Sequence, residues 1–205
     1  MQETSLLLGA QNMNDSSEGA FTGEIAGTML VDAGAQFVLI GHSERRHFYG
    51  EDDGCINRKV KRAIDVGLLP ILCVGETQEE YQAQQTRSVL ERQLIGALKG
   101  IEPSHVQKLI VAYEPVWAIG NAQSASPDHV QEAHAFCRQI LATILTEELA
   151  QQIVIQYGGS VNPLNAQDLL AQPDVDGLLI GGASLSIETF RQIVNDRYTK
   201  IQTEG

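Results

Sequence analysis

The chain has 205 residues, of which 43% are hydrophobic and 20% are charged, and its formal net charge at pH 7 is -12. This length and composition are typical of a globular protein with a sizeable core. The acidic balance argues against nucleic-acid binding, which requires basic surface. No apolar run approaches the roughly 20 residues of a membrane span, and the start, "MQETSLLLGAQN", lacks the basic residues of a signal peptide. We therefore expect neither a membrane nor a nucleic-acid partner.

Six short apolar runs are typical of buried strands. In chain order they span residues 5–11, 37–42, 68–76, 108–114, 152–159 and 177–184. Helical spacing or helix-start signals lie between them, at 23–34, 55–67, 79–100, 126–145 and 187–196. Ser126, followed by proline and aspartate, is a strong predicted N-cap. Asn162, followed by proline, predicts another helix start, and Ser186 is expected to cap the last helix.

Strands that alternate with helices predict an α/β protein with parallel strands and right-handed crossovers. Two architectures fit this pattern: an open doubly wound sheet and a (β/α) barrel. No linker or low-complexity segment divides the sequence, so we expect one domain over residues 1–205. In both architectures function lies at the carboxyl ends of the strands. Those ends carry Asn12, His42, Ser43, Glu76 and Glu114, and the glycine-rich runs 157–160 and 181–184.

The last two strand ends, "YGGS" and "GGAS", are the glycine-rich ones. Glycine lets backbone N–H groups approach an anion closely, and a following helix adds positive potential. (β/α)8 barrels frequently bind phosphate with the loops after strands seven and eight. This favours the barrel and numbers these two strands seven and eight. On that count the sequence holds about six β/α units of eight.

Glu114 ends a buried strand and is followed at once by proline. A glutamate there is often only the first polar residue of a loop, but its clustering with other polar strand ends favours a general base. Ser43 can cap a short helix, and the positive potential at that helix end would keep His42 neutral, as a hydrogen-bond donor. The following loop, 115–126, suits a lid that excludes water, although an ordinary crossover loop also fits.

Two other residues receive a structural interpretation. Glu76 is read as the start of a helix with acids in its first turn, and Cys73 as a buried packing residue. The three cysteines, Cys55, Cys73 and Cys137, are widely spaced, which predicts neither zinc nor a disulfide framework. A reducing compartment fits this cysteine usage, and we expect a cytoplasmic location.

A base, a neutral donor, a phosphate-binding loop pair and a lid indicate proton abstraction next to a carbonyl in a small phosphorylated substrate. Such chemistry requires no cofactor. The sequence shows no nucleotide-binding fingerprint and no metal-ligand cluster, so we expect neither a cofactor nor a metal.

The motifs "IGHSERR", "AYEPVWAIG", "QYGGSV" and "GGASL" resemble the signature motifs of the triosephosphate isomerase family, and "GAQN", "GAFTGE" and "LPILCVGET" match as well. The resemblance covers essentially the whole chain. It implies a TIM (β/α)8 barrel and the interconversion of dihydroxyacetone phosphate and D-glyceraldehyde 3-phosphate, in glycolysis and gluconeogenesis. The pattern of a glutamate base, a neutral histidine and a closing loop was described for this enzyme itself.

The resemblance also implies residue roles. Glu114 would move a proton between two carbons of the triose, and His42 would polarise the carbonyl and stabilise the enediolate. Backbone N–H groups would hold the phosphate, at Gly120, Ser160, Gly181 and Gly182. The family is usually a homodimer, and the segment around Thr22 resembles the loop that docks into the partner subunit.

Three features depart from the family pattern. The family's first strand ends in an "NWK"-like motif that supplies a catalytic lysine, and this sequence has none; "NRK" at 57–59 lies on an expected helix. The resemblance therefore implies an N-terminally truncated chain that lacks two β/α units, the lysine partner of Glu44 and the groove for the dimer loop. In the lid, Ala122 and Gln123 stand where glycine and lysine are common.

Three interpretations of function remain from the sequence. The first is a triosephosphate isomerase whose gene or record extends upstream of Met1. The second is a non-catalytic remnant, impaired by loss of the lysine. An upstream in-frame "NWK" would favour the first and a stop codon the second. The third is another phosphate-binding barrel enzyme, which would gain support if Glu114→Asp left activity intact.

Overall fold

The computed structural model describes residues 6–106, 109–120 and 124–203. Six parallel strands form one sheet in these residues, in the sequence order β1 to β6. The strands are β1 Gly9–Ala10, β2 Phe37–Ile40, β3 Leu69–Val74, β4 Ile110–Tyr113, β5 Val154–Tyr157 and β6 Gly177–Leu178. Each lies inside a predicted apolar run. A doubly wound sheet reverses its strand order at a switch point, so the sequential order selects the barrel.

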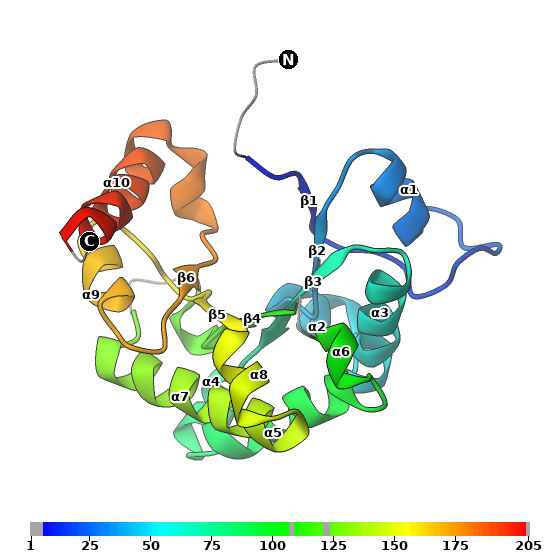
Figure 1. Ribbon diagram of the computed structural model, residues 1–205, viewed down its shortest axis with the longest axis horizontal. Helices are drawn as coiled ribbons and strands as arrows, with labels where there is room; N and C mark the ends of the chain where they lie inside the picture. Colours follow the sequence, from blue (N-terminus) through cyan, green and yellow to red (C-terminus); the bar gives the residue numbers. More distant parts are fainter. Residues whose placement is uncertain (1–5, 107–108, 121–123, 204–205) are drawn as a thin grey trace.

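Helices cover the outer face of this curved sheet (Figure 1). They are α1 Gly27–Asp32, α2 Ser43–Tyr49, α3 Asp53–Asp65, α4 Gln78–Gln82, α5 Thr86–Leu98, α6 Pro103–Val106, α7 Pro127–Ile144, α8 Glu147–Gln152, α9 Ala166–Leu170 and α10 Ile187–Thr203, with 3-10 turns η1 Val116–Ala118 and η2 Gly182–Leu185. Within the described residues the edge strands β1 and β6 do not pair with each other. The fold is therefore a partial TIM barrel.

Helix starts follow the predicted capping chemistry. The Ser126 hydroxyl accepts the His129 N–H, and the Ser186 hydroxyl accepts the Thr189 N–H, so both predicted caps are confirmed. The predicted helix start at Asn162 is wrong by three residues: Asn165 is the N-cap of α9, and Asn162 accepts backbone N–H groups in the turn just before it. The predicted stretch 79–100 forms two helices, α4 and α5, because the chain breaks at Gln84, which has a φ of 58°.

The two central strands, β3 and β4, are buried on both faces almost throughout, as apolar strands covered by helices should be. In β2 and β5, buried residues alternate with partly exposed or exposed ones. Alternate residues such as Leu72 and Val74 face the helices and join the main core, whereas Ile71, Cys73 and Ala112 form a smaller cluster on the concave face. Cys73 is fully buried, which agrees with its interpretation as a packing residue. Burial raises the pKa of its thiol well above the usual value, so the group stays protonated.

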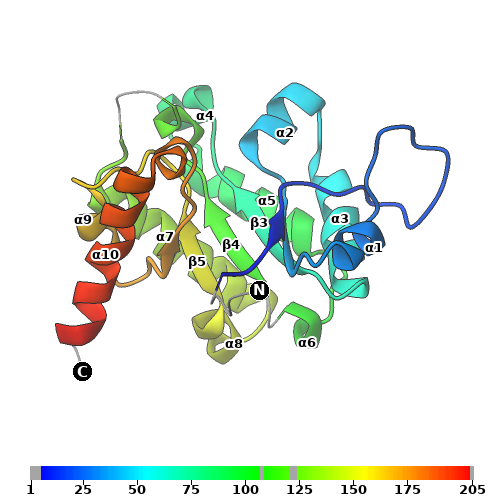
Figure 2. The same ribbon diagram turned by 90° about the horizontal axis from the view of Figure 1, so that it is seen from above.

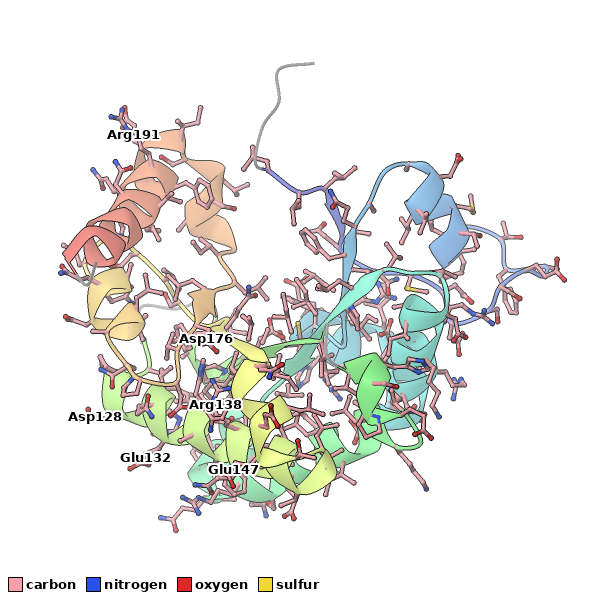
Figure 3. All side chains as sticks on the ribbon, viewed as in Figure 1. Asp128, Glu132, Arg138, Glu147, Asp176 and Arg191 are labelled. Atoms are coloured by element: carbon pink, nitrogen blue, oxygen red, sulfur yellow. The ribbon has the colours of Figure 1, made fainter. Side chains whose placement is uncertain are left out.

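A buried cation ties α7 to the last strands. The Arg138 guanidinium donates to Asp174 Oδ1 at 2.6 Å, to Asp176 Oδ2 at 3.0 Å and to the carbonyls of Ala150 and Ile153. Figure 3 shows Arg138 and Asp176 together at this junction. Charge-assisted hydrogen bonds of this kind anchor α7 to the segments that precede β5 and β6.

The elements that follow strands gather at one end of the sheet. In Figure 2, α2 and α4, which follow β2 and β3, lie at one end, and α6 and α8, which precede β4 and β5, lie at the other. Parallel strands thus bring their carboxyl ends to a common rim, as the candidate site requires. In the described part of the chain, every helix is too short or too polar to span a bilayer.

Candidate active site

A cavity of about 390 Å³ opens at the carboxyl ends of the strands. This volume is within the usual range for small-molecule sites. The residues that line it are Gln11, Leu39, His42, Glu44, Glu114, Ile119, Gly120, Gly158, Gly159, Ser160, Val161, Leu179, Ile180, Gly181, Gly182 and Ala183. All six predicted site residues are therefore brought together around one space. A second cavity, of about 780 Å³, lies at the opposite end of the strands and is lined mostly by apolar side chains.

His42 and Glu114 are in direct contact. His42 Nε2 lies 3.0 Å from Glu114 Oε1, and the backbone N–H of Ser43 donates to Glu114 Oε2 at 3.0 Å. The Glu114 side chain is only 3% exposed, so these two donors offset part of the cost of burying its charge. The hydrogen bond with Glu114 raises the pKa of His42, and burial opposes it.

The structure corrects the predicted cap beside the site. His42, not Ser43, is the N-cap of α2, since its Nδ1 accepts the backbone N–H of Glu44 at 3.3 Å. An N–H donor can approach only an unprotonated ring nitrogen. The helix end therefore fixes the tautomer that carries its proton on Nε2, the nitrogen that faces Glu114. Protonation of Nδ1 would break the cap hydrogen bond. The cap therefore favours the neutral imidazole, whereas Glu114 favours the protonated one.

Glycines determine where Glu114 sits. A Cβ at Gly75 would lie 1.8 Å from the Glu114 carbonyl oxygen, and one at Gly158 would lie 2.9 Å from Glu114 Cγ. Both neighbouring strand ends must therefore lack a side chain for Glu114 to occupy its place. Gln93 holds Gly75 in turn, through hydrogen bonds to both its N–H and its carbonyl.

Glu76 is buried beneath the start of the segment 115–126, the predicted lid. It is 0% exposed and accepts Trp117 Nε1–H at 2.8 Å and the Tyr113 hydroxyl at 3.0 Å. The interpretation of Glu76 as an ordinary helix start missed this role: α4 begins two residues later, with Thr77 as its cap. The available signal was a glutamate that ends a fully apolar strand, the feature that singled out Glu114.

The glycine-rich strand ends form the other side of the cavity. Gly181 and Gly182 lead into η2, and a Cβ at either would meet no atom within 4 Å. Gly120 has a φ of 71° at the lid's middle. Ser160 lines the same space, but its backbone N–H donates to the Ala118 carbonyl at 2.9 Å. Ala122 and Gln123 lie outside the described residues.

The described lining of the cavity contains no lysine or arginine. Lys59, the last residue of "NRK", lies on α3 as expected and bonds Glu51 and Asn12 away from the cavity. Glu44 has a side chain 71% exposed, with an oxygen 4.0 Å from His42 Nδ1. Among the described residues, no cluster of three or more His, Cys, Asp or Glu side chains is placed to hold a metal ion.

Comparisons with known proteins agree on one family. The family model described as "Triosephosphate isomerase" matches residues 1–197. The chain is 62% identical to a triosephosphate isomerase from Protochlamydia amoebophila, over 96% of this chain and 74% of the relative. Triosephosphate isomerases of Rhodopirellula baltica and Carboxydothermus hydrogenoformans are each 48% identical, over 93% and 95% of this chain and 75% and 77% of the relatives.

Proposed function

This chain belongs to the triosephosphate isomerase family, and we propose that its site interconverts dihydroxyacetone phosphate and D-glyceraldehyde 3-phosphate through an enediolate. One observation carries the proposal. A desolvated carboxylate, Glu114, and an imidazole with its proton on the facing nitrogen, His42, meet at 3.0 Å in a cavity walled by glycine-rich strand ends. A carboxylate placed beside the substrate can take a proton from carbon, and a neutral imidazole can donate a hydrogen bond without a change of charge.

The proton path follows from this geometry. Substrate entering between the two side chains would take the Nε2–H of His42 on its carbonyl oxygen, in place of Glu114. Glu114 would then remove a proton from the carbon next to the carbonyl, giving an enediolate, and return it to the former carbonyl carbon. His42 Nε2 would give its proton to the former carbonyl oxygen and take one from the hydroxyl on the other carbon, whose O–H bond breaks as the new C=O forms. Both carboxylate oxygens are bound in the structure. Transfer of the His42 hydrogen bond to the substrate would free Oε1, while the Ser43 N–H would continue to hold Oε2.

The substrate phosphate would lie against Gly181 and Gly182, where the open backbone lets N–H groups approach an anion. Gly120 would contact it from the lid. Ser160 would contribute its N–H after the Ala118 carbonyl withdraws, which links phosphate binding to movement of the lid base. A closed lid would keep water from the enediolate.

The alternative proposal is that the 205 residues alone are a weak or inactive catalyst. Its support is the described cavity lining, which holds no cation to oppose charge on the developing oxyanion. Loss of one preorganised donor to an oxyanion typically costs about 10²–10³ in kcat. His42 alone would then carry that charge.

An assay of both directions with the purified 205-residue chain, alongside Glu114→Asp, separates the two. Measurable isomerisation that falls at least about tenfold in Glu114→Asp supports the proposed enzyme. Equal rates for the two proteins, both near the uncatalysed rate, support the alternative. Equal and substantial rates would remove Glu114 from the mechanism and favour another phosphate-binding barrel enzyme.

The family resemblance extends this proposal to assembly and location. We propose a homodimer in which the loop 11–24 docks into a partner copy; the loop projects from the body in Figures 1 and 2, and its Phe21 is 51% exposed. The backbone N–H of Asn14 donates to the Ile25 carbonyl and so joins the two ends of the loop. A cytoplasmic location and a role in glycolysis and gluconeogenesis belong to the same proposal, and the free thiols of Cys55, Cys73 and Cys137 suit a reducing compartment.

A further inference from the structure

His129 lies where the lid ends. It is the third residue of α7, directly after the segment 115–126, whereas Tyr113 is the residue directly before Glu114 and the lid. His129 Nε2 is 3.0 Å from the Tyr113 hydroxyl. A single hydrogen bond thus joins the two ends of the lid and reaches the residue next to the proposed base. No sequence pattern singles out this histidine.

The direction of this hydrogen bond follows from counting protons. The Tyr113 hydroxyl has one proton and lies 3.0 and 3.2 Å from the two oxygens of buried Glu76, to which it donates. Burial raises the pKa of Tyr113 well above its usual value, so that proton stays on the hydroxyl. His129 must then donate its Nε2–H to the Tyr113 oxygen. The chain of donors runs from His129 to Tyr113 to Glu76.

Ring packing supports the same connection. Trp117, the first large side chain of the lid, stacks on Tyr81 with centroids 4.1 Å apart. The His129 ring meets both of these rings edge-on, at 5.4 Å. Trp117 also donates to Glu76. His129, Tyr113, Trp117, Tyr81 and Glu76 therefore form one cluster, here termed the lid-base cluster, in which His129 alone comes from the far end of the lid.

We propose that His129 is a positioning residue: its Nε2–H bond to Tyr113 couples the end of the lid to its start and thereby fixes the backbone that carries Glu114. The catalytic part of this inference rests on the isomerase function proposed above. The coupling itself does not, because it concerns the arrangement of the lid-base cluster in the protein without substrate. His129 touches no substrate in this scheme, since it does not line the 390 Å³ cavity.

A matched pair of substitutions isolates the donor from the ring. His129→Phe keeps an aromatic ring and removes the donor, whereas His129→Gln removes the ring and keeps an N–H donor. We expect His129→Phe to lower kcat about three- to tenfold with KM changed less than about twofold, the scale of one lost hydrogen bond. His129→Gln should stay within about twofold of the wild type in both constants. The proposal fails if the two variants behave alike, or if Phe equals the wild type.

A second readout works without turnover. Trp117 is the only tryptophan of the chain and is 5% exposed, so acrylamide quenching of its fluorescence reports opening of the lid base. We expect the quenching constant to rise by at least about twofold in His129→Phe and to stay near wild type in His129→Gln. His105→Leu, at the opposite end of the strands near the 780 Å³ cavity, is the control and should change neither readout.

The two readouts separate this inference from the proposed function. If the wild type shows no isomerase activity but quenching distinguishes Phe from Gln, the function fails and the coupling stands. If the wild type is active and both readouts are the same in the two variants, the function stands and the coupling is wrong. Circular dichroism on each variant verifies the fold, and a misfolded Phe variant is replaced by His129→Leu in the same comparison with Gln.

Discussion

The two sides of the active-site cavity are built differently. On the base side, Glu114 and Glu76 are buried, and both accept hydrogen bonds from neighbouring elements. On the side proposed to bind phosphate, here termed the phosphate side, Gly181 and Gly182 lie open, and the segments around them expose large apolar side chains. Leu164 is 93% exposed, Leu185 89% and Ile187 86%.

This difference separates the orientation of the base from the binding of phosphate. The base side is held by contacts among described residues from β3, β4, α2 and α7, so its geometry is fixed before substrate arrives. The phosphate side offers backbone N–H groups with little packing around them. A bound anion would therefore help to order this part of the backbone. Substitutions on the base side should therefore change kcat, and substitutions on the phosphate side should change KM.

The largest effect is expected from Glu114→Gln. The amide can still accept the Ser43 N–H, but it cannot take a proton from carbon, so the rate should fall about 10²–10⁴-fold. Uptake of solvent deuterium by dihydroxyacetone phosphate measures this step directly. The melting temperature should change little, because removal of a buried charge offsets the loss of the acceptor that faces the Nε2–H of His42. Retained exchange, or a collapse of the fold, would contradict the separation of base from scaffold.

The second prediction concerns His134, which is 0% exposed on α7 behind Tyr113. Burial lowers its pKa to about 4 from 6.5, and only Nδ1 has a partner, the Asp174 carbonyl at 3.0 Å. Unfolded protein takes up this proton near pH 6.5 and folded protein only near pH 4. The free energy of unfolding should therefore be fully retained above pH 6.5 and fall by roughly 3 kcal/mol from there to pH 4.

His134→Asn tests this prediction, since asparagine keeps a donor near the Nδ1 position and does not titrate. Urea unfolding of both proteins between pH 7 and pH 4 isolates the histidine from the other groups that titrate in that range. The wild type should lose more stability than the variant on acidification. If the free energy of unfolding falls equally in the two proteins on acidification, water reaches His134 more readily than its burial indicates.

The sequence predicted those parts of the site that short local patterns mark. Polar residues after apolar runs marked Glu114 and His42, and parallel strands bring such ends together whatever the loops do. The glycine runs after β5 and β6 marked the other wall in the same manner. The roles of these residues remain proposals, but their meeting at one cavity could be predicted.

The remaining features depend on contacts that no local pattern records. Glu76 is buried beside Trp117 and Tyr113, which lie 41 and 37 residues later in the chain and donate hydrogen bonds to it. His42 rather than Ser43 caps α2, a shift of one residue from the sequence prediction. His129 bonds the hydroxyl of Tyr113, which lies 16 residues earlier in the chain. Such tertiary partners determine the role of a polar residue once its strand or helix is known.

The third prediction contrasts the two sides with one substitution each. Gly158→Ala places a Cβ 2.9 Å from Glu114 Cγ, so the base must shift by a few tenths of an ångström, and kcat should fall about tenfold. Gly181→Ala adds a methyl group that meets no atom within 4 Å. It should leave kcat unchanged and raise KM by no more than about threefold, by partly covering the backbone N–H groups.

Steady-state kinetics on both variants decides the comparison, with melting temperatures to confirm folding. We expect kcat to fall in Gly158→Ala and KM to rise in Gly181→Ala. A fall in kcat for Gly181→Ala of the size seen for Gly158→Ala would mean that both walls position the reacting groups, and that the separation drawn above is wrong.

The smallest effect is expected from Leu185→Ser on the phosphate side. With 89% of Leu185 exposed, its removal takes almost no apolar surface out of the core, so the free energy of unfolding should change by less than about 0.5 kcal/mol. Its neighbour Ile187 is equally uncovered, and adjoining exposed apolar residues promote association. Sedimentation over a concentration series should therefore show less self-association in the variant, while urea unfolding stays unchanged. A loss above about 1 kcal/mol would show that Leu185 is packed in solution, and that the phosphate side is as well supported as the base side.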